Sequence, residues 1–409
     1  MRLLKIMYHP HDNYSILATL KADGSIEKTV VGSIAESLTL DSHDTASYNR
    51  LKKFSEMNPC SLLLLPLPKM DNYSQNGDKL KTAITAFAEK WVENNLVEPE
   101  FLTYVTSNKV SFPWTMIDKI TPRPNTSVEE LLKKDGVQDL DPVITGKHTY
   151  VAPFVNSEEC EYLVIEDTFP NGRPALEKSG FIFTDRETVD KVERMKVCTC
   201  LNPLHTALAV FGCLLDYKLI AEEMKDSTLK TLVERLGYQE GLPVVTDPGI
   251  LNPKEFLDTV LGIRIPNPFM PDTPQRIATD TSQKLSIRYG ETIKAYEKSS
   301  TLQTSDLKMI PLVFAGWLRY LTGKNDRLED FPVSPDPMAD ILGSVVSSVK
   351  LDGTCSVEHA ESLLHPVLEN EKIWGVNLYD AGLAPSVCHY FIEMTKGAGA
   401  VRSTLEKYV

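Results

Sequence analysis

The spacing of apolar residues changes near Thr184, and this change limits the possible folds more than any other feature of the sequence. Up to that point, short strand-like segments are mixed with helical ones. Beyond it, apolar residues recur at the spacing of an α-helix, interrupted by Pro and Gly. Mixed strands and helices favour a layered α/β structure, whereas a run of helices packs on itself. The sequence therefore predicts an α/β part over residues 1–185, followed by a mainly helical, all-α part over residues 186–409.

The first part is expected to begin with a β-hairpin. Segments 15–20 and 26–31 have strand composition, and residues 21–24 (Lys-Ala-Asp-Gly) suit the turn between them. Further strands are predicted at 61–65, 101–106 and 162–166, and an amphipathic helix is predicted at 80–94. In the second part, helices are predicted at 206–217, 229–237, 253–261, 282–298, 307–321, 337–350, 357–368 and 385–396.

Composition and charge exclude several classes of partner. The 409 residues, 42% of them hydrophobic, are enough for a sizeable globular core. A net charge of −13 without a basic cluster argues against nucleic acid or an anionic membrane, but leaves room for an anionic substrate in a local Arg/Lys pocket. No apolar run approaches the ~18 residues of a membrane span, and the first residues lack the apolar core of a signal peptide. We expect a cytoplasmic protein that is a monomer.

Residues 196–205 bring three chemically useful side chains close together in the sequence. Asn202 before Pro203 predicts a helix that starts at Pro203 with Asn202 as its cap. His205 then lies in the first helical turn, and Lys196 lies upstream. An amine, an amide and an imidazole around one helix start suit proton transfer at a carbonyl or an alcohol. The alternative is structural: Asn202 only a cap, His205 a core histidine, and Lys196 a solvated lysine.

The seven cysteines do not indicate a disulfide framework, because their number is odd and they are scattered along a long chain. Cys198, Cys200 and His205 could be read as zinc ligands, but no second cysteine pair accompanies them, so we expect no metal. The sequence also has no glycine-rich dinucleotide motif after a strand. The only similar string, at residues 397–402, lacks a strand–turn–helix context and predicts a helix end with a flexible tail.

Several motifs occur along the chain in the order of a known family. They lie at 11–14, 31–34, 70–77, 116–122, 165–167 with 172–174, 201–205, and 276–280 leading to 284. Each motif alone is weak, but the ordered set resembles the polyol-specific long-chain dehydrogenases, which include mannitol 2-dehydrogenase and fructuronate reductase.

This resemblance implies a two-domain enzyme. Its Rossmann-like N-terminal domain (1–185) would bind NAD or NADP, and its helical C-terminal domain (186–409) would hold the sugar. The implied reaction is hydride transfer between a ketose or keto-sugar acid, such as fructose or fructuronate, and its polyol or aldonate. A lysine acts as the acid/base, without a metal. A sugar or sugar acid is thus the expected partner, with fructuronate-type substrates favoured because the candidate pocket is cationic.

The resemblance also assigns residues. Lys196 would be the acid/base, since burial can bring a lysine pKa towards ~7–8. Asn72 and Asn202 would be the amides that stabilise the developing alkoxide, and Asp118 would lie near the lysine. The residues that would contact substrate hydroxyls or a carboxylate are His205, Arg276 and Lys284. The cofactor-binding residues remain unassigned.

The structural alternatives for these residues stay open. Asp118 could pair with Lys119, Asn72 could serve a turn, and Arg276 and Lys284 could form a solvated face. Arg264 and Arg288 are rival cations for a substrate carboxylate.

Three departures from the family pattern qualify the expectation. The chain begins after the glycine-rich unit of the family, and segment 61–65 runs almost directly into Asn72, without the length that a parallel crossover needs. Lys196 lies six residues before Asn202, where the family pattern has five. We therefore expect an incomplete Rossmann-like domain. The alternative is a truncated, catalytically impaired family member that acts as a sugar- or protein-binding module.

Overall fold

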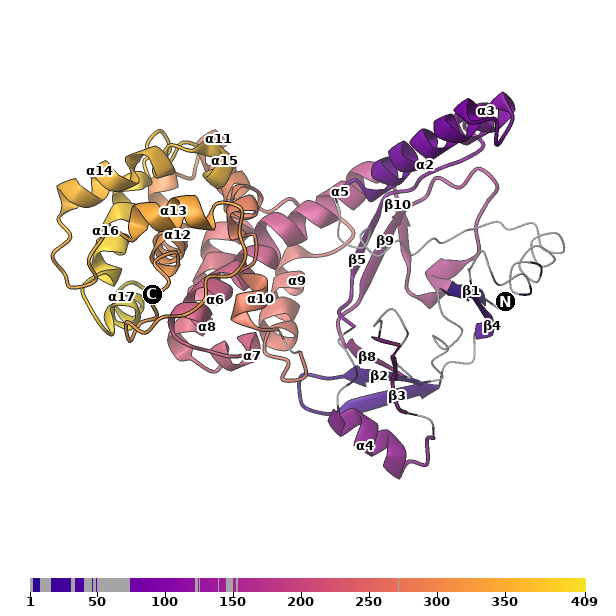
Figure 1. Ribbon diagram of the computed structural model, residues 1–409, viewed down its shortest axis with the longest axis horizontal. Helices are drawn as coiled ribbons and strands as arrows, with labels where there is room; N and C mark the ends of the chain where they lie inside the picture. The colour runs from indigo at the N-terminus through magenta and orange to yellow at the C-terminus, as the bar shows by residue number, and fades with distance from the viewer. Residues whose placement is uncertain are drawn as a thin grey trace. The chain divides into compact units, whose positions relative to one another are not determined.

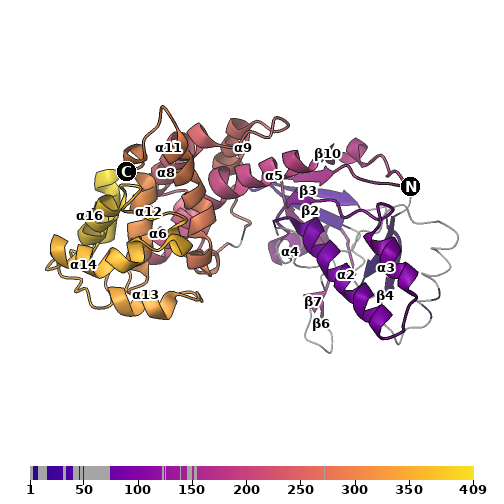
Figure 2. The same cartoon turned by 90° about the horizontal axis from the view of Figure 1, so that it is seen from above.

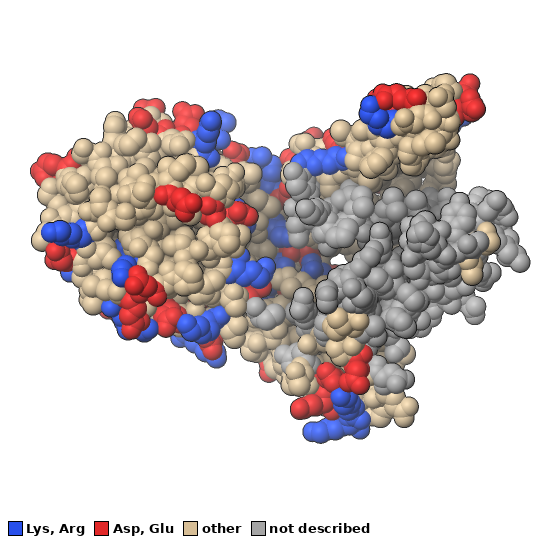
Figure 3. All heavy atoms as spheres, viewed as in Figure 1, with Lys and Arg blue, Asp and Glu red and all other residues tan. Residues whose placement is uncertain are grey.

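A computed structural model describes residues 3–7, 16–30, 34–39, 46, 49, 74–121, 124, 126–138, 140–144, 150–151, 154–270 and 272–409. The chain divides into two compact units, an N-terminal unit, Met1–Asp190, and a C-terminal unit, Lys191–Val409 (Figure 1). Each unit is described by itself below. On the face drawn in Figure 3, Lys and Arg side chains of the described residues are interspersed with Asp and Glu.

The N-terminal unit combines small sheets with a few helices. Its strands are β1 (Leu3–Met7), β2 (Ile16–Leu20), β3 (Ile26–Val30), β4 (Ile34–Thr39), β5 (Thr115–Asp118), β6 (Val143–Ile144), β7 (Tyr150–Val151), β8 (Val155–Glu158), β9 (Tyr162–Glu166) and β10 (Ile182–Thr184). The predicted hairpin is confirmed as β2 and β3, which pair antiparallel, and β2 also pairs parallel with β8. A second sheet has the order β10-β9-β5, with β9 and β10 parallel. β1 and β4 also pair parallel. The predicted strand at 61–65 lies outside the described residues.

Helices α2 (Asn76–Glu93) and α3 (Pro99–Thr106) form a hairpin of helices, seen from two sides in Figures 1 and 2. The helix predicted at 80–94 is confirmed, but most of its apolar stripe is not buried. Phe87 is 65% exposed, and its ring centre lies 6.5 Å from that of Trp91. The strand predicted at 101–106 is wrong. Pro99 at the first helical position starts α3 instead, and this start outweighs the strand preference of Phe101 and Val105.

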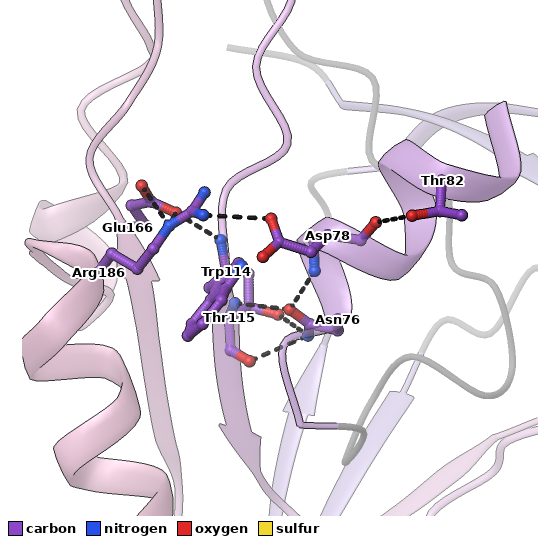
Figure 4. A network of polar contacts seen from close by, with 8 residues as sticks. Asn76, Asp78, Thr82, Trp114, Thr115, Glu166 and Arg186 are labelled. Carbon is purple, nitrogen blue, oxygen red and sulfur yellow. Dashed lines mark hydrogen bonds and ion pairs between the residues drawn. The ribbon is translucent and has the colours of Figure 1, made fainter. Parts of the chain in front are cut away.

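A polar network joins the start of α2 to strands β5 and β9 (Figure 4). The side chain of Asn76 accepts a bond from the N–H of Thr115 at 3.0 Å and donates to its hydroxyl at 2.7 Å. Glu166, at the end of β9, accepts the N–H of Trp114 at 2.9 Å and is bound by Arg186 at 3.0 Å. These contacts fix where α2, β5, β9 and α5 (Arg186–Arg194) begin or end. The unit also contains α4 (Thr126–Lys134) and the short η1 (Leu176–Ser179).

The described part of the C-terminal unit is helical, apart from one isolated bridge between Lys324 and Asp330. In chain order its helices are η2 (Met195–Cys200), α6 (Asn202–Leu214), α7 (Ile220–Glu223), α8 (Ser227–Glu234), η3 (Arg235–Gly241), η4 (Leu242–Val244), α9 (Pro253–Thr259), η5 (Val260–Arg264), α10 (Pro274–Ile277), η6 (Thr281–Gln283), η7 (Ser286–Gly290), α11 (Glu291–Lys298), η8 (Thr304–Asp306), α12 (Met309–Tyr320), α13 (Ala339–Val346), α14 (Val357–Leu368), α15 (Glu371–Trp374), α16 (Ala384–Met394) and α17 (Ala400–Tyr408).

Helix α12 is the centre of this unit. All of its residues are buried, as expected of a helix that is apolar on every side, and it packs against α16, α6 and η3 (Figure 1). Phe314 and Trp317 of α12 lie against Trp374, with ring centres 4.6 and 5.5 Å apart. The carboxylate of Glu240, from η3, accepts the N–H groups of Lys308 and Met309 at 2.6 Å and of Ile310 at 2.9 Å, and so caps the start of α12.

Two predictions for the C-terminal unit are corrected. The helix predicted at 282–298 is divided into η6, η7 and α11, because η7 is a π-helix between a 3₁₀ turn and a regular helix. The predicted flexible tail is instead the helix α17. Its first turn is capped by Asp326, whose carboxylate accepts the N–H of Val401 at 2.8 Å and of Arg402 at 3.2 Å.

The run Arg186–Leu214, made of α5, η2 and α6, is long and apolar enough to cross a membrane by length and composition alone. In the structure, 83% of its most apolar window is buried, as is usual for the core helix of a globular protein. The run therefore gives only weak support for membrane insertion.

Candidate functional site

Lys196 lies in the π-helix η2 and is 6% exposed. The N–H of Leu201 donates to the carbonyl of Lys196 at 3.1 Å, which is the i→i+5 bond of a π-turn. Such a turn accommodates one residue more than an α-helical turn. Asn202 follows Lys196 by six positions rather than five, and a π-turn accommodates one such additional residue. Turns of this kind occur frequently at functional sites.

The helix that carries Asn202 and His205 begins one residue earlier than predicted. Helix α6 starts at Asn202, and Leu201 precedes it without a side-chain cap. The predicted capping role of Asn202 is therefore wrong, because Leu201, with φ −132° and ψ −61°, separates η2 from α6 and occupies the cap position. The N–H of His205 bonds to the carbonyl of Leu201 at 3.1 Å. The side-chain amide of Asn202 forms no hydrogen bond with the described residues and is partly exposed. It is thus available to a ligand.

His205 faces an acidic residue that the sequence did not single out. Its Nε2 lies 3.6 Å from Oδ2 of Asp272, which precedes α10. Burial lowers the pKa of His205 to about 4; Asp272 opposes this effect, whereas the charges of Arg288, Arg264 and Arg276 reinforce it. His205 is consequently a neutral imidazole at pH 7, able to donate one hydrogen bond and accept another.

Arg276 lies on α10, which packs against α6 (Figure 1). Its guanidinium forms an ion pair with Asp272, four residues earlier, and its side chain is 61% exposed. Asp272 thereby joins His205 to Arg276, and two of the predicted substrate residues belong to one cluster. The spacing of Asp272 and Arg276 by four residues was the sequence signal for this pair.

Lys284 is directed towards the backbone around the end of α10. Its ammonium donates to the carbonyl of Thr279 and, at 3.4 Å, to that of Ile277. Burial, helped by the charges of Arg288 and Arg276 and opposed by those of Asp280 and Asp336, lowers the pKa of Lys284 to about 8. Lys284 therefore closes the α10 turn as well as adding positive charge to the cluster.

Arg288, which the sequence offered only as a rival cation, is held beside the first turn of α6. Its Nη1 donates to the hydroxyl of Thr206, and that hydroxyl donates to the carbonyl of Asn202 at 3.0 Å. The guanidinium is partly buried in η7, and burial lowers the pKa of Arg288 to about 10. Arg288 remains charged at pH 7.

The remaining two candidates belong to the N-terminal unit. Asn72 lies outside the described residues. Asp118 ends β5 and is 2% exposed, and its backbone pairs with that of Tyr162. Lys119, its sequence neighbour, forms an ion pair with Glu161 at 2.6 Å. The expected closeness of Asn72 and Asp118 to Lys196 stays a prediction.

Neither a metal nor a nucleotide can be placed on the described residues. Within those residues, no group of three or more His, Cys, Asp or Glu side chains could hold a metal ion. A dinucleotide pyrophosphate is commonly held by a glycine-rich turn between a strand and a helix. Gly77 at the start of α2 offers no such cradle, because a Cβ there would lie 2.2 Å from the carbonyl oxygen of Phe112. We therefore assign none of the described residues of the N-terminal unit to the nucleotide.

Residues 188–393, about half of the chain, match the family of mannitol dehydrogenase C-terminal domains. The matched span contains Lys196, Asn202, His205, Arg276 and Lys284. The chain belongs to the mannitol dehydrogenase family. The family resemblance inferred from the ordered motifs is thereby confirmed.

Named relatives agree with this assignment. D-mannonate oxidoreductase of Thermotoga maritima is 45% identical over 459 aligned positions, which cover 98% of this chain and 84% of the relative. Because this chain has 409 residues, at least 50 of those positions face gaps in it. Mannitol 2-dehydrogenase of Phaeosphaeria nodorum is 29% identical over 76% of this chain, which spans 50% of that relative.

Solved structures support the fold. Mannitol 2-dehydrogenase of Pseudomonas fluorescens, in a ternary complex with NAD and D-mannitol, matches with a TM-score of 0.62 at 22% identity, over 96% of this chain and 82% of that chain. A substrate-free D-sorbitol dehydrogenase matches with a TM-score of 0.65 at 19% identity, over 91% and 83%. The predicted fold class, a partial Rossmann-like α/β domain followed by a helical domain, is confirmed.

Proposed function

We propose that this protein is an NAD-dependent oxidoreductase that interconverts a sugar acid and its keto acid. The 45% identity to D-mannonate oxidoreductase over 98% of the chain carries this proposal. D-Mannonate and its oxidation product D-fructuronate are the proposed substrate pair. The structural neighbour solved with NAD supports NAD as the nucleotide, with NADP to be tested beside it.

In this proposal the C-terminal unit supplies the proton chemistry. Lys196 gives a proton to the carbonyl oxygen of the keto acid during reduction and takes it back during oxidation. The amide of Asn202, which the described residues leave without a hydrogen bond, stabilises the charge that develops on that oxygen. The neutral imidazole of His205 binds a substrate hydroxyl, and Arg276 and Lys284 make the pocket cationic.

From the N-terminal unit, Asn72 is proposed as a second amide and Asp118 as the carboxylate near the lysine. These two roles rest on the family motifs alone.

The test is an activity assay with four substrates. Purified protein should oxidise NADH when D-fructuronate is added, and it should reduce NAD when D-mannonate is added. D-fructose and D-mannitol are the uncharged substrates with which these two acids are compared. Binding of NADH and NADPH is followed separately by their fluorescence. If neither NADH nor NADPH binds, the proposal is wrong. A second candidate function is a family member that binds its ligand without turnover, and the gaps in the alignment of this chain favour testing it. Binding of a sugar acid without binding of a nucleotide would support this second candidate.

A further inference from the structure

We infer that Arg288 is the residue of the C-terminal unit that binds the carboxylate of a sugar acid and so selects acids over neutral sugars. The inference deepens the proposed function and rests on it for the identity of the ligand. It begins from four cations, Arg264, Arg276, Lys284 and Arg288, each close enough to affect its neighbours by charge.

Three of the four cations are already engaged. The guanidinium of Arg276 is neutralised by its ion pair with Asp272, and most of its side chain faces solvent. The ammonium of Lys284 donates to two backbone carbonyls. Arg264 is 7% exposed, and its side chain is not free. Arg276 donates through Nη2 alone, so its Nε and Nη1 form no hydrogen bond with the described residues. Its charge is nevertheless balanced by Asp272, and in this it differs from Arg288.

Arg288 differs because its charge is not balanced by an acid among the described residues. Its hydrogen bond within those residues goes to a neutral hydroxyl, that of Thr206. A partly buried guanidinium without an acid is costly, since burial removes hydration that a carboxylate would otherwise replace. The shift in the pKa of Arg288 has the same origin, because burial lowers it. A bound carboxylate would remove this cost.

The orientation of Arg288 also suits a carboxylate. A guanidinium has five N–H donors in a fixed planar fork, and two parallel donors on one edge match the two oxygens of a carboxylate. Nη1 is used by Thr206, while Nε and Nη2 form no hydrogen bond with the described residues. The Nε/Nη2 edge is thus available as a bidentate site. Thr206 fixes the guanidinium by accepting its bond and donating to the carbonyl of Asn202 at 3.0 Å.

The position of Arg288 links carboxylate binding to the candidate reaction site. Thr206 is the neighbour of His205 in the first turn of α6, and the charge of Arg288 acts on the imidazole of His205. A ligand carboxylate on Arg288 would therefore place the sugar chain next to His205 and to the amide of Asn202. A neutral polyol would leave the charge of Arg288 unbalanced, so the site would discriminate against it.

Two variants of this position test the inference. Arg288→Met removes the charge and keeps much of the length, and Thr206→Val removes the hydroxyl that holds the guanidinium. With D-fructuronate we expect Arg288→Met to raise KM at least ~100-fold, as loss of a bidentate charged pair implies, and Thr206→Val to raise it roughly 3–10-fold, as loss of one positioning hydrogen bond implies. With D-fructose both variants should change KM less than about threefold, since no carboxylate is present. Thr206→Val keeps the test valid if Arg288→Met does not fold.

The matched control is Arg327→Met, which removes an exposed arginine that pairs with Asp216 and Glu329. It should leave both KM values unchanged. An equal rise of KM for D-fructuronate and D-fructose in Arg288→Met would overturn the inference, because it would indicate a structural role.

A binding measurement separates this inference from the proposed function. Calorimetric titration of the nucleotide-free protein with D-mannonate and with D-mannitol needs no turnover. Binding of D-mannonate by the parent protein and its loss in Arg288→Met would support the carboxylate site even if no reaction occurs. Unchanged binding of D-mannonate in Arg288→Met, or no preference of the parent protein for D-mannonate over D-mannitol, would overturn it.

Discussion

The cap that Glu240 provides for α12 leads to a quantitative prediction about stability. Its carboxylate accepts three backbone N–H groups at the start of the central helix of the C-terminal unit. Lys308 is exposed, so its N–H can bind water when the cap is lost, whereas Met309 and Ile310 are buried. Each buried N–H without an acceptor costs about 1–3 kcal/mol. Two such groups lose their acceptor, so we expect Glu240→Ala to lower the free energy of unfolding of this unit by about 2–6 kcal/mol.

Glu240→Gln separates the hydrogen bonds from the space that the side chain fills. The amide keeps one oxygen for Lys308 and Met309, both bound by the same carboxylate oxygen, but places a donor opposite the N–H of Ile310. One bond is lost, so the expected cost is about 1–2 kcal/mol. Glu234→Gln, on the neighbouring α8, is the control: its carboxylate is 40% exposed and lies 3.9 Å from Lys230, so the change should stay within about 0.5 kcal/mol.

The assay is urea unfolding followed by tryptophan fluorescence, combined with hydrogen exchange of the peptide that contains Met309–Tyr320. Trp317 and Trp374 report on the core of the C-terminal unit. The amides at the start of α12 should exchange faster in Glu240→Ala than in the parent protein. A loss below about 1 kcal/mol, with unchanged exchange at Met309 and Ile310, would show that these N–H groups find other acceptors and would refute the reasoning.

Three further predictions concern single residues. Lys196→Met should lower kcat at least ~100-fold, as loss of a general acid–base group does, with nucleotide binding retained; turnover within tenfold of the parent protein would remove Lys196 from its role. His205 has a pKa of about 4 in the folded protein and 6.5 as its reference value, so the unfolded chain takes up the proton at a higher pH. The free energy of unfolding of the parent protein, relative to that of His205→Gln, should therefore fall as the pH drops from 6.5 towards 4. Urea unfolding at a series of pH values measures this. Arg319→Met should destabilise the C-terminal unit by about 3–5 kcal/mol, because four oxygen acceptors lose a buried donor; a melting temperature unchanged from that of the parent protein would contradict this.

The helical half of the fold could be predicted because helical spacing is a local property of the sequence. Helix α12 was found in this way. The hairpin of β2 and β3 was found from an equally local signal, strand composition on either side of a turn sequence. Helix α3 was missed because Phe101, Tyr104 and Val105 favour strands, while the decisive residue was Pro99 at its start. The tail was missed because the cap of α17 comes from Asp326, which is distant in sequence.

The candidate site was predictable in its residues more than in its contacts. Asn202 and His205 were recognised because they are only three positions apart in the sequence, and both belong to the first turn of α6. The pairing of His205 with Asp272 joins residues far apart in the chain, so periodicity could not reveal it. The π-turn at Lys196 could not be predicted either. The sequence shows only one additional residue between Lys196 and Asn202, and packing determines how the helix accommodates it.

The exposed aromatic side chains of α2 have a consequence for how copies of the protein behave at high concentration. Phe87 and Trp91 form an exposed apolar surface, which attracts another copy of the protein only on contact. The net charge of −13 repels other copies over longer distances. Added salt shortens the reach of that repulsion to roughly 8 Å at physiological ionic strength and leaves the attraction intact. Light scattering should therefore show that net repulsion between copies weakens as salt is raised. Replacing Phe87 by a polar residue should reduce the attraction that remains at high salt.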